Sequence, residues 1–128
     1  MTLLFLALAT RDKKTNMTSA VARKLDTIRQ KAGFKNIDVA NVLGTRAETV
    51  SRWSQGKAYP QGTAERNLLE LEYIVDQLSE FYNPQEARLW MFSRQRLLSD
   101  ESPADLIKSG HIDDVLQLIR EMREAVFR

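Results

Sequence analysis

Four residues at fixed spacing constrain the fold of this chain most strongly: Ala40, Gly44, Val50 and Trp53. A small residue at position 40 lets two helices cross closely, and Gly44 accepts the positive φ that ends the first helix. Val50 and Trp53 are three residues apart and therefore share one face of a second helix. This pattern predicts a helix-turn-helix within residues 36–55, with a helical hairpin that binds no ligand as the alternative.

The start of the second helix decides which of its side chains face outward. Thr45 is expected to cap this helix and Glu48 to complete a capping box, so that the helix begins at Arg46. The outward face can enter a DNA major groove, where Arg46 and Arg52 are candidates for contacts with guanine. The expected DNA-binding residues are Lys35, Asn36, Arg46, Ala47, Glu48, Ser51, Arg52, Gln55 and Lys57.

Charge is divided unevenly along the chain, although the net charge is only +2. Residues 18–62 hold eight Lys or Arg against three acids, a net of +5, whereas residues 63–128 hold eight against thirteen, a net of −5. The first 17 residues add +2. A basic segment suits nucleic-acid phosphate, and an acidic segment is repelled by phosphate and suits a protein partner.

The chain is predicted to be all-α, because no segment alternates apolar and polar residues as a strand does. Six or seven helices are expected, the first from about Ala20 to Ala32 and a long one from Thr63 to about Tyr82. The predicted division is an N-terminal extension at 1–17, a helix-turn-helix domain at 18–62, a connecting helix at 63–82 and a further helical domain at 83–128.

Two helix starts in the last third are marked by their capping residues. Asn83, Pro84 and Glu86 supply a cap, a first-turn proline and an acid, and Ser102, Pro103 and Asp105 repeat the device. The second of these helices is short and ends at Gly110. A final helix begins near Asp113, and its expected apolar side consists of Val115, Leu116, Ile119, Met122, Val126 and Phe127. Val126 and Phe127, the terminal pair, either form a contact site for a partner protein or pack on the chain's own core.

Catalytic and metal chemistry find little support. The chain has no cysteine and one histidine, His111, expected in a turn, which removes most metal sites and most pairs of nucleophile and base. Asp113 and Asp114 are adjacent on a helix and point in different directions. We therefore expect no enzyme activity, no metal and no cofactor.

The apolar N-terminus, L-L-F-L-A-L-A-T, is far too short to span a membrane. It resembles a short signal-peptide core but lacks a basic segment before it. A start at Met17, which leaves residues 1–16 as an upstream extension, is the favoured explanation. The expectation is a cytoplasmic protein without a membrane partner.

Three segments of the last third resemble the toxin-binding domain of the Xre/MbcA/ParS-type antitoxins. They read L-W-M-F-S-R-Q-R-L-L (89–98), S-P-A-D-L-I-K-S-G (102–110) and D-D-V-L-Q-L-I (113–119). Their order behind an Xre-like helix-turn-helix is that of the family, and the resemblance covers about residues 20–128. It implies a helix-turn-helix bundle joined by a long helix to a small toxin-binding domain.

The resemblance also implies partners. Proteins of this family inhibit RES-domain toxins by covering the toxin's active site. These toxins degrade NAD and are encoded by an adjacent gene. The antitoxins also bind operator DNA and so repress their own operon. The candidate toxin-binding residues carried over are Trp90, Phe92, Arg94, Leu97, Leu98, Pro103, Asp105, Leu106, Gly110, Val126 and Phe127. Among them Val126 and Phe127, the terminal pair, are the residues favoured to block the toxin's NAD pocket and so act as its plug. For Trp90, Leu106 and Leu116 a place in the chain's own core is favoured.

One alternative remains: a helix-turn-helix regulator whose C-terminal half dimerises or senses a ligand and binds no toxin. In either case a single helix-turn-helix covers only one half-site of an operator. A homo-oligomer is therefore expected, together with a hetero-oligomer if a toxin binds.

Overall fold

The structure is a computed structural model that describes residues 13–127, with side chains from residue 20 onward. This part of the chain contains no strand, only an isolated bridge between Gln95 and Glu101. Its helices are α2 (Lys13–Ala32), α3 (Asn36–Leu43), α4 (Ala47–Ser54), α5 (Thr63–Leu78), α6 (Pro84–Phe92), α7 (Pro103–Lys108) and α8 (Ile112–Val126), with a 3-10 turn, η1, at Arg96–Leu98. The predicted all-α class is confirmed.

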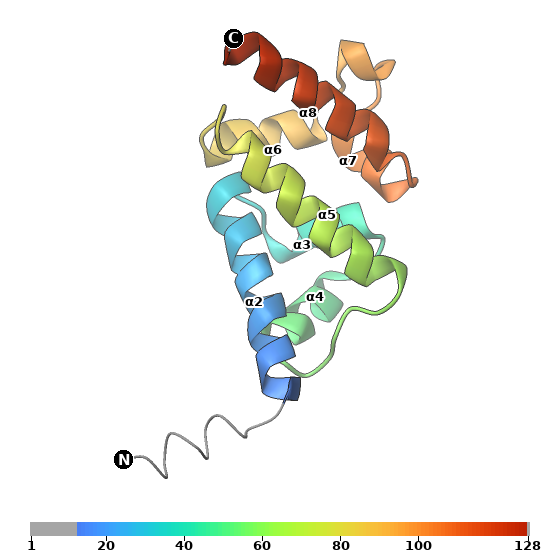
Figure 1. The fold of residues 1–128 in the computed structure, drawn as a ribbon. Helices are drawn as coiled ribbons and strands as arrows, with labels where there is room; N and C mark the ends of the chain where they lie inside the picture. Colours follow the sequence, from blue (N-terminus) through green and yellow to red (C-terminus); the bar gives the residue numbers. More distant parts are fainter. Residues whose placement is uncertain (1–12, 128) are drawn as a thin grey trace, which may run out of the picture.

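Helices α2 and α5 pack against each other, and in Figure 1 α2 occupies the lower part of the molecule while α5 extends up toward α6 and α8. Helices α3 and α4 pack against each other on one side of this pair, while α6, α7 and α8 gather at the end that carries the C-terminus. A single cluster of buried side chains draws on all seven helices. Because α5 contacts both α2 and α8, it joins the two ends of that core.

The turns between helices follow from local chemistry. Gly44 has a φ of 70°, and the amide of Thr45 donates to the carbonyl of Ala40 over 2.9 Å, which closes α3. At the start of α6, the Asn83 side chain accepts a hydrogen bond from the Glu86 amide, and the Glu86 carboxylate accepts one from the Asn83 amide. Ser102 caps α7 with one hydrogen bond, which its Oγ accepts from the Asp105 amide. The two capped helix starts predicted from the sequence are confirmed.

Three predicted helix boundaries are wrong. Helix α2 begins at Lys13 instead of about Ala20, and α4 begins at Ala47 because Arg46, in an extended conformation, takes the capping position. The expected side-chain cap from Thr45 is absent, because the capping position falls one residue later, at Arg46, whose side chain makes no capping hydrogen bond. Helix α5 ends at Leu78.

Helix α5 is followed by a turn, and the chain is extended again just before α6. Asn83, the residue that precedes Pro84, has φ −72° and ψ 171°. Residues 79–82, which precede Asn83, form a turn. In this turn the amides of Glu80 and Phe81 donate hydrogen bonds to carbonyls three residues earlier in the chain.

The expected N-terminal extension lies mostly outside the described residues, and α2 begins within it. Among residues 13–127, no helix has both the length and the apolar character that crossing a membrane requires.

Candidate DNA-binding and partner-binding surfaces

Helix α4 presents a polar face to solvent and an apolar face to the core. Val50 and Trp53 are buried, as the spacing predicts, and they pack in the core that also holds Ala40. On the opposite face Arg46 and Arg52 are exposed. The arrangement leaves two guanidinium groups free to reach a ligand that lies across α4.

The other candidate DNA-binding residues surround this face. Lys35, Glu48, Gln55 and Lys57 are exposed, whereas Asn36, Ala47 and Ser51 are half-buried. The amide of Lys57 donates to the carbonyl of Arg52 over 2.9 Å, which folds the loop after α4 back onto the helix. This loop therefore holds a third cation next to the end of α4.

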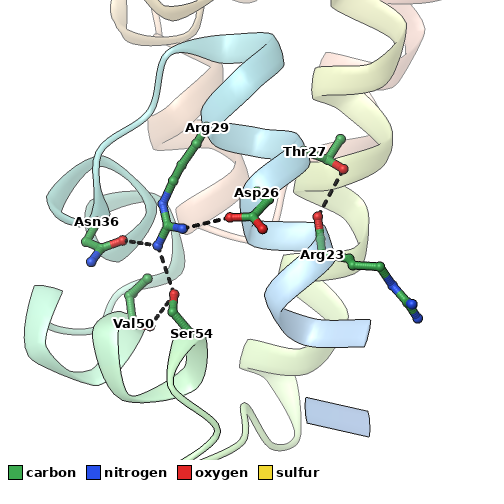
Figure 2. Close-up of polar contacts among 7 residues, drawn as sticks. All are labelled: Arg23, Asp26, Thr27, Arg29, Asn36, Val50 and Ser54. Carbon is green, nitrogen blue, oxygen red and sulfur yellow. Dashed lines mark hydrogen bonds and ion pairs between the residues drawn. The ribbon is translucent and has the colours of Figure 1, made fainter. Parts of the chain in front are cut away.

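Arg29 connects α2 to both α3 and α4 (Figure 2). Its Nη2 donates to Asn36 Oδ1 over 2.7 Å and to Ser54 Oγ over 2.8 Å, and its Nη1 donates to Asp26 Oδ1 over 3.0 Å. Ser54 Oγ in turn donates to the carbonyl of Val50. The Oδ1 of Asn36 is thus occupied, whereas its side-chain NH₂ group has no hydrogen-bond partner among the described residues.

A buried ion pair joins α3 to α6. Asp38 is only 4% exposed, and its carboxylate accepts from Arg88 Nε over 3.1 Å, from Arg88 Nη2 over 2.9 Å and from the Lys35 amide over 2.8 Å. Burial raises the pKa of Asp38, but the hydrogen bonds from Arg88 and the Lys35 amide outweigh it and hold that pKa below its ordinary value of 3.8. The Arg88 guanidinium also lies over the Phe92 ring, 5.5 Å from its centroid.

Sequence reasoning missed Arg29, Asp38 and Arg88. Asp38 could be read only as the third residue of a helix, and the chain separates it from Arg88 by 50 positions. No local pattern signals such a pair. In the sequence, Arg29 is only one of the eight basic residues of segment 18–62.

The candidate toxin-binding residues divide into buried and exposed sets. Trp90, Leu98 and Pro103 are buried, and Phe92 and Leu106 are half-buried. The exposed set consists of Arg94, Leu97, Asp105, Gly110, Val126 and Phe127. The place predicted for Trp90 in the chain's own core is confirmed, and Leu106 and Leu116 pack against that core from its edge.

The exposed set occupies more than one site. The exposed Leu97 lines one cavity, together with the buried Leu98 and the half-buried Leu106, between the loop around η1 and α8. The terminal pair lies at the other end of α8, where the Phe127 ring meets the Phe81 ring at 5.9 Å. Val126 and Phe127 are nevertheless 61% and 59% exposed, so the expected apolar side of α8 extends beyond its packing partners.

Comparison with known proteins identifies the family. No family model matches the chain. The mycobacterial cidal antitoxin MbcA, from Mycobacterium bovis and from Mycobacterium tuberculosis, is 37% identical over 98 residues, which cover 77% of this chain and 87% of the relative. The chain belongs to the MbcA family of antitoxins. A probable mycobacterial cidal antitoxin of M. tuberculosis is 29% identical over 83 residues, 65% of this chain and 70% of that protein.

The fold is that of a solved MbcA-family structure. The crystal structure of the M. tuberculosis MbcT–MbcA toxin–antitoxin complex contains a chain with a TM-score of 0.73 and 34% sequence identity to this one. The match covers 84% of this chain and 96% of that chain. Nearly the whole of the solved chain thus has a counterpart here.

Proposed function

We propose that this chain neutralises a RES-domain, NAD-degrading toxin encoded next to it by covering the toxin's active site, and that it binds operator DNA to repress its own operon. One observation carries the proposal: the chain shares fold and sequence with a chain of the MbcT–MbcA toxin–antitoxin complex. The identity of the toxin class rests on the family resemblance of residues 89–119.

The surface of the C-terminal half supports a protein partner. Of the seven large apolar side chains that are exposed among the described residues, Leu89, Leu97, Val126 and Phe127 lie in residues 83–128. Exposed apolar side chains set among polar ones are typical of protein interfaces. The net charge of −5 over residues 63–128 complements a toxin that binds an anionic dinucleotide and is basic near its pocket.

The N-terminal half supports the DNA-binding part of the proposal. Arg46 and Arg52 project from α4, and residues 18–62 carry a net charge of +5. Helix α4 lies away from the C-terminus along the molecule (Figure 1), so a toxin held near the chain's end and DNA held at α4 would not compete for one surface.

The toxin part is tested by co-expression with the neighbouring reading frame and by an NAD-loss assay. We expect the neighbour to be toxic alone, to copurify with this chain and to lose its NAD-degrading activity when the chain is added. A chain truncated after Met122 should protect poorly if the terminal pair is the plug. Leu69→Ala, which shortens an exposed leucine on α5, is the matched control and should protect fully.

The outcomes separate the proposals. Equal protection by the truncated and full chains would rule out the plug and leave inhibition by the rest of the domain. A neighbour that is neither toxic nor retained by this chain would overturn the antitoxin function and favour a regulator whose C-terminal half dimerises or senses a ligand.

DNA binding is tested with the sequence upstream of the operon. Replacement of Arg46 or Arg52 by Ala should cost about 1–3 kcal/mol on the specific site and relax base preference there. Arg120→Ala removes an exposed arginine from α8 and should leave operator affinity unchanged. Unaltered specificity in the α4 variants would refute the assignment of these arginines to base contacts.

A further inference from the structure

A groove lies between α8 and the loop that contains η1. Its volume is about 370 Å³. The apolar part of its lining comes from Leu97, Leu98, Leu106 and Leu118. The charged part comes from Glu101, Asp114 and Glu121, and no lysine or arginine lines it. The groove therefore combines four leucines with an acidic rim of three carboxylates, next to the neutral polar side chains of Ser99 and Gln117.

The loop that forms one wall is held in place by its own hydrogen bonds. The Gln95 amide donates to the Glu101 carbonyl over 3.0 Å, and the Asp100 amide donates to the Gln95 carbonyl over 3.0 Å. Ser99 and Asp100 both have positive φ, at 57° and 65°, a conformation that non-glycine residues seldom adopt. Such backbone persists only where the surrounding contacts enforce it, and it is concentrated at functional sites.

This loop presents Leu97 to solvent. Leu97 is 77% exposed, the highest value among the large apolar side chains described. The hydrogen bonds of the loop fix the backbone on either side of Leu97, so little further ordering is needed when a partner covers it. An apolar side chain that is held outward beside a groove has the character of an interface anchor.

The acidic rim has no internal counter-charge. Five carboxylates elsewhere in the described residues form ion pairs, namely Asp26, Asp38, Glu72, Asp76 and Glu80. Glu101, Asp114 and Glu121 form none with any described residue, and Glu121 accepts only a neutral hydrogen bond from Gln117. Their charge is thus available to a partner's cation.

We propose that this groove docks a segment of the toxin in which an apolar side chain is flanked by lysine or arginine. The apolar side chain would pack against Leu97, Leu106 and Leu118, and the cations would pair with the rim carboxylates. The inference rests on the proposed function, because it assigns the toxin to one surface of this chain. It adds an anchoring site apart from the terminal pair at the far end of α8.

The test uses the full chain and the purified product of the adjacent toxin reading frame. Leu97→Ala should weaken the complex about tenfold or more, as expected for an anchor residue. The matched control is Leu69→Ala, which shortens another exposed leucine, 47% accessible, on α5 and away from the groove. Neither leucine is buried, so both variants should keep the melting temperature of the parent chain.

A second arm addresses the rim. The double variant Glu101→Gln and Glu121→Gln should slow association with the toxin and reduce the dependence of the association rate on ionic strength. Wild-type affinity and salt dependence in all groove variants, with a parent chain that still binds the toxin, would overturn the groove and leave the proposed function intact. A parent chain that fails to bind would overturn the proposed function itself. If Leu97→Ala changes only the oligomeric state of the free chain, a second copy occupies the groove and the proposal is wrong.

Discussion

The ion pair between Asp38 and Arg88 provides a quantitative test of how the two ends of the molecule are joined. Arg88→Met removes the guanidinium but keeps an unbranched apolar stem against Phe92. Asp38 would then lose two of its three hydrogen bonds and keep only the one from the Lys35 amide. The carboxylate would remain almost fully buried and would keep only the weaker attraction of the Lys35 charge.

The expected cost follows from the burial of each partner. Breaking a fully buried pair costs about 3–5 kcal/mol, and an exposed pair contributes about 0–1 kcal/mol. Asp38 is buried, but the Arg88 side chain is 46% exposed and water screens part of its charge. We therefore expect Arg88→Met to lower the free energy of unfolding by about 2 kcal/mol, which lowers the melting temperature by roughly 8 °C for a chain of this size.

The assay is a double-mutant cycle measured by thermal and denaturant unfolding. It combines Arg88→Met with Asp38→Asn, a nearly isosteric change that removes the negative charge, and the double variant removes both charges. If the pair acts as a unit, the two single changes should be strongly non-additive, with a coupling of about 2 kcal/mol. Additivity within about 0.5 kcal/mol would refute the reasoning and would mean that packing alone joins α3 to α6.

The same pair predicts a pH dependence with a defined sign. The folded-state pKa of Asp38 lies below its ordinary value of 3.8, so the folded chain holds this carboxylate ionised more strongly than the unfolded chain does. The stabilisation is fully present above that ordinary value and is lost as pH falls through the lower, folded-state pKa. The stability advantage of the parent chain over Asp38→Asn should be constant near neutral pH and should shrink only in acid.

Three further outcomes are expected. Asn83→Ala removes the cap of α6 and should cost about 1 kcal/mol in unfolding free energy, while Gln85→Ala, at an exposed position of the same helix, should cost far less. Gly44→Ala meets no atom within 4 Å, so its expected cost of about 1 kcal/mol comes from the positive φ alone, measured in the same way. Arg29→Met should weaken operator binding by about tenfold, corresponding to a charged hydrogen bond, in a gel-shift or anisotropy assay. Affinity equal to that of the parent would show that Arg29 does not position Asn36 for DNA.

Features that depend on neighbouring residues could be predicted from the sequence. A side-chain cap followed by proline starts a helix wherever it occurs, which is why the starts of α6 and α7 agree with expectation. Gly44 ends α3 for a similarly local reason. Thr45 is the exception, because α4 begins one residue later than expected and Arg46 occupies the capping position.

Features that depend on distant packing could not be predicted. Leu118 is buried, although the expected apolar side of α8 does not include it. Helix α8 packs against α7 and η1 as well as α5, and therefore buries a wider stripe of side chains than expected. Val126 was included in that side but lies beyond any partner. Leu97 shows the same limit in the candidate site, since its exposure depends on a loop whose shape is set by bonds between Gln95 and residues 100 and 101.

The shared core constrains how the two proposed activities can influence each other. Helices α3 and α4, with the candidate DNA-binding face, belong to the same buried cluster as α7 and α8, and the Asp38–Arg88 pair reinforces that connection. A continuous core connects the candidate DNA-binding face to the proposed toxin-binding surface, and α5 contacts both α2 and α8 within it. A toxin that changed operator affinity would therefore do so mainly by setting how many copies of this chain are joined in one complex, since joined copies bind repeated half-sites with increased effective concentration. In such a case, operator affinity should depend on the number of antitoxin chains per complex rather than on the presence of toxin as such.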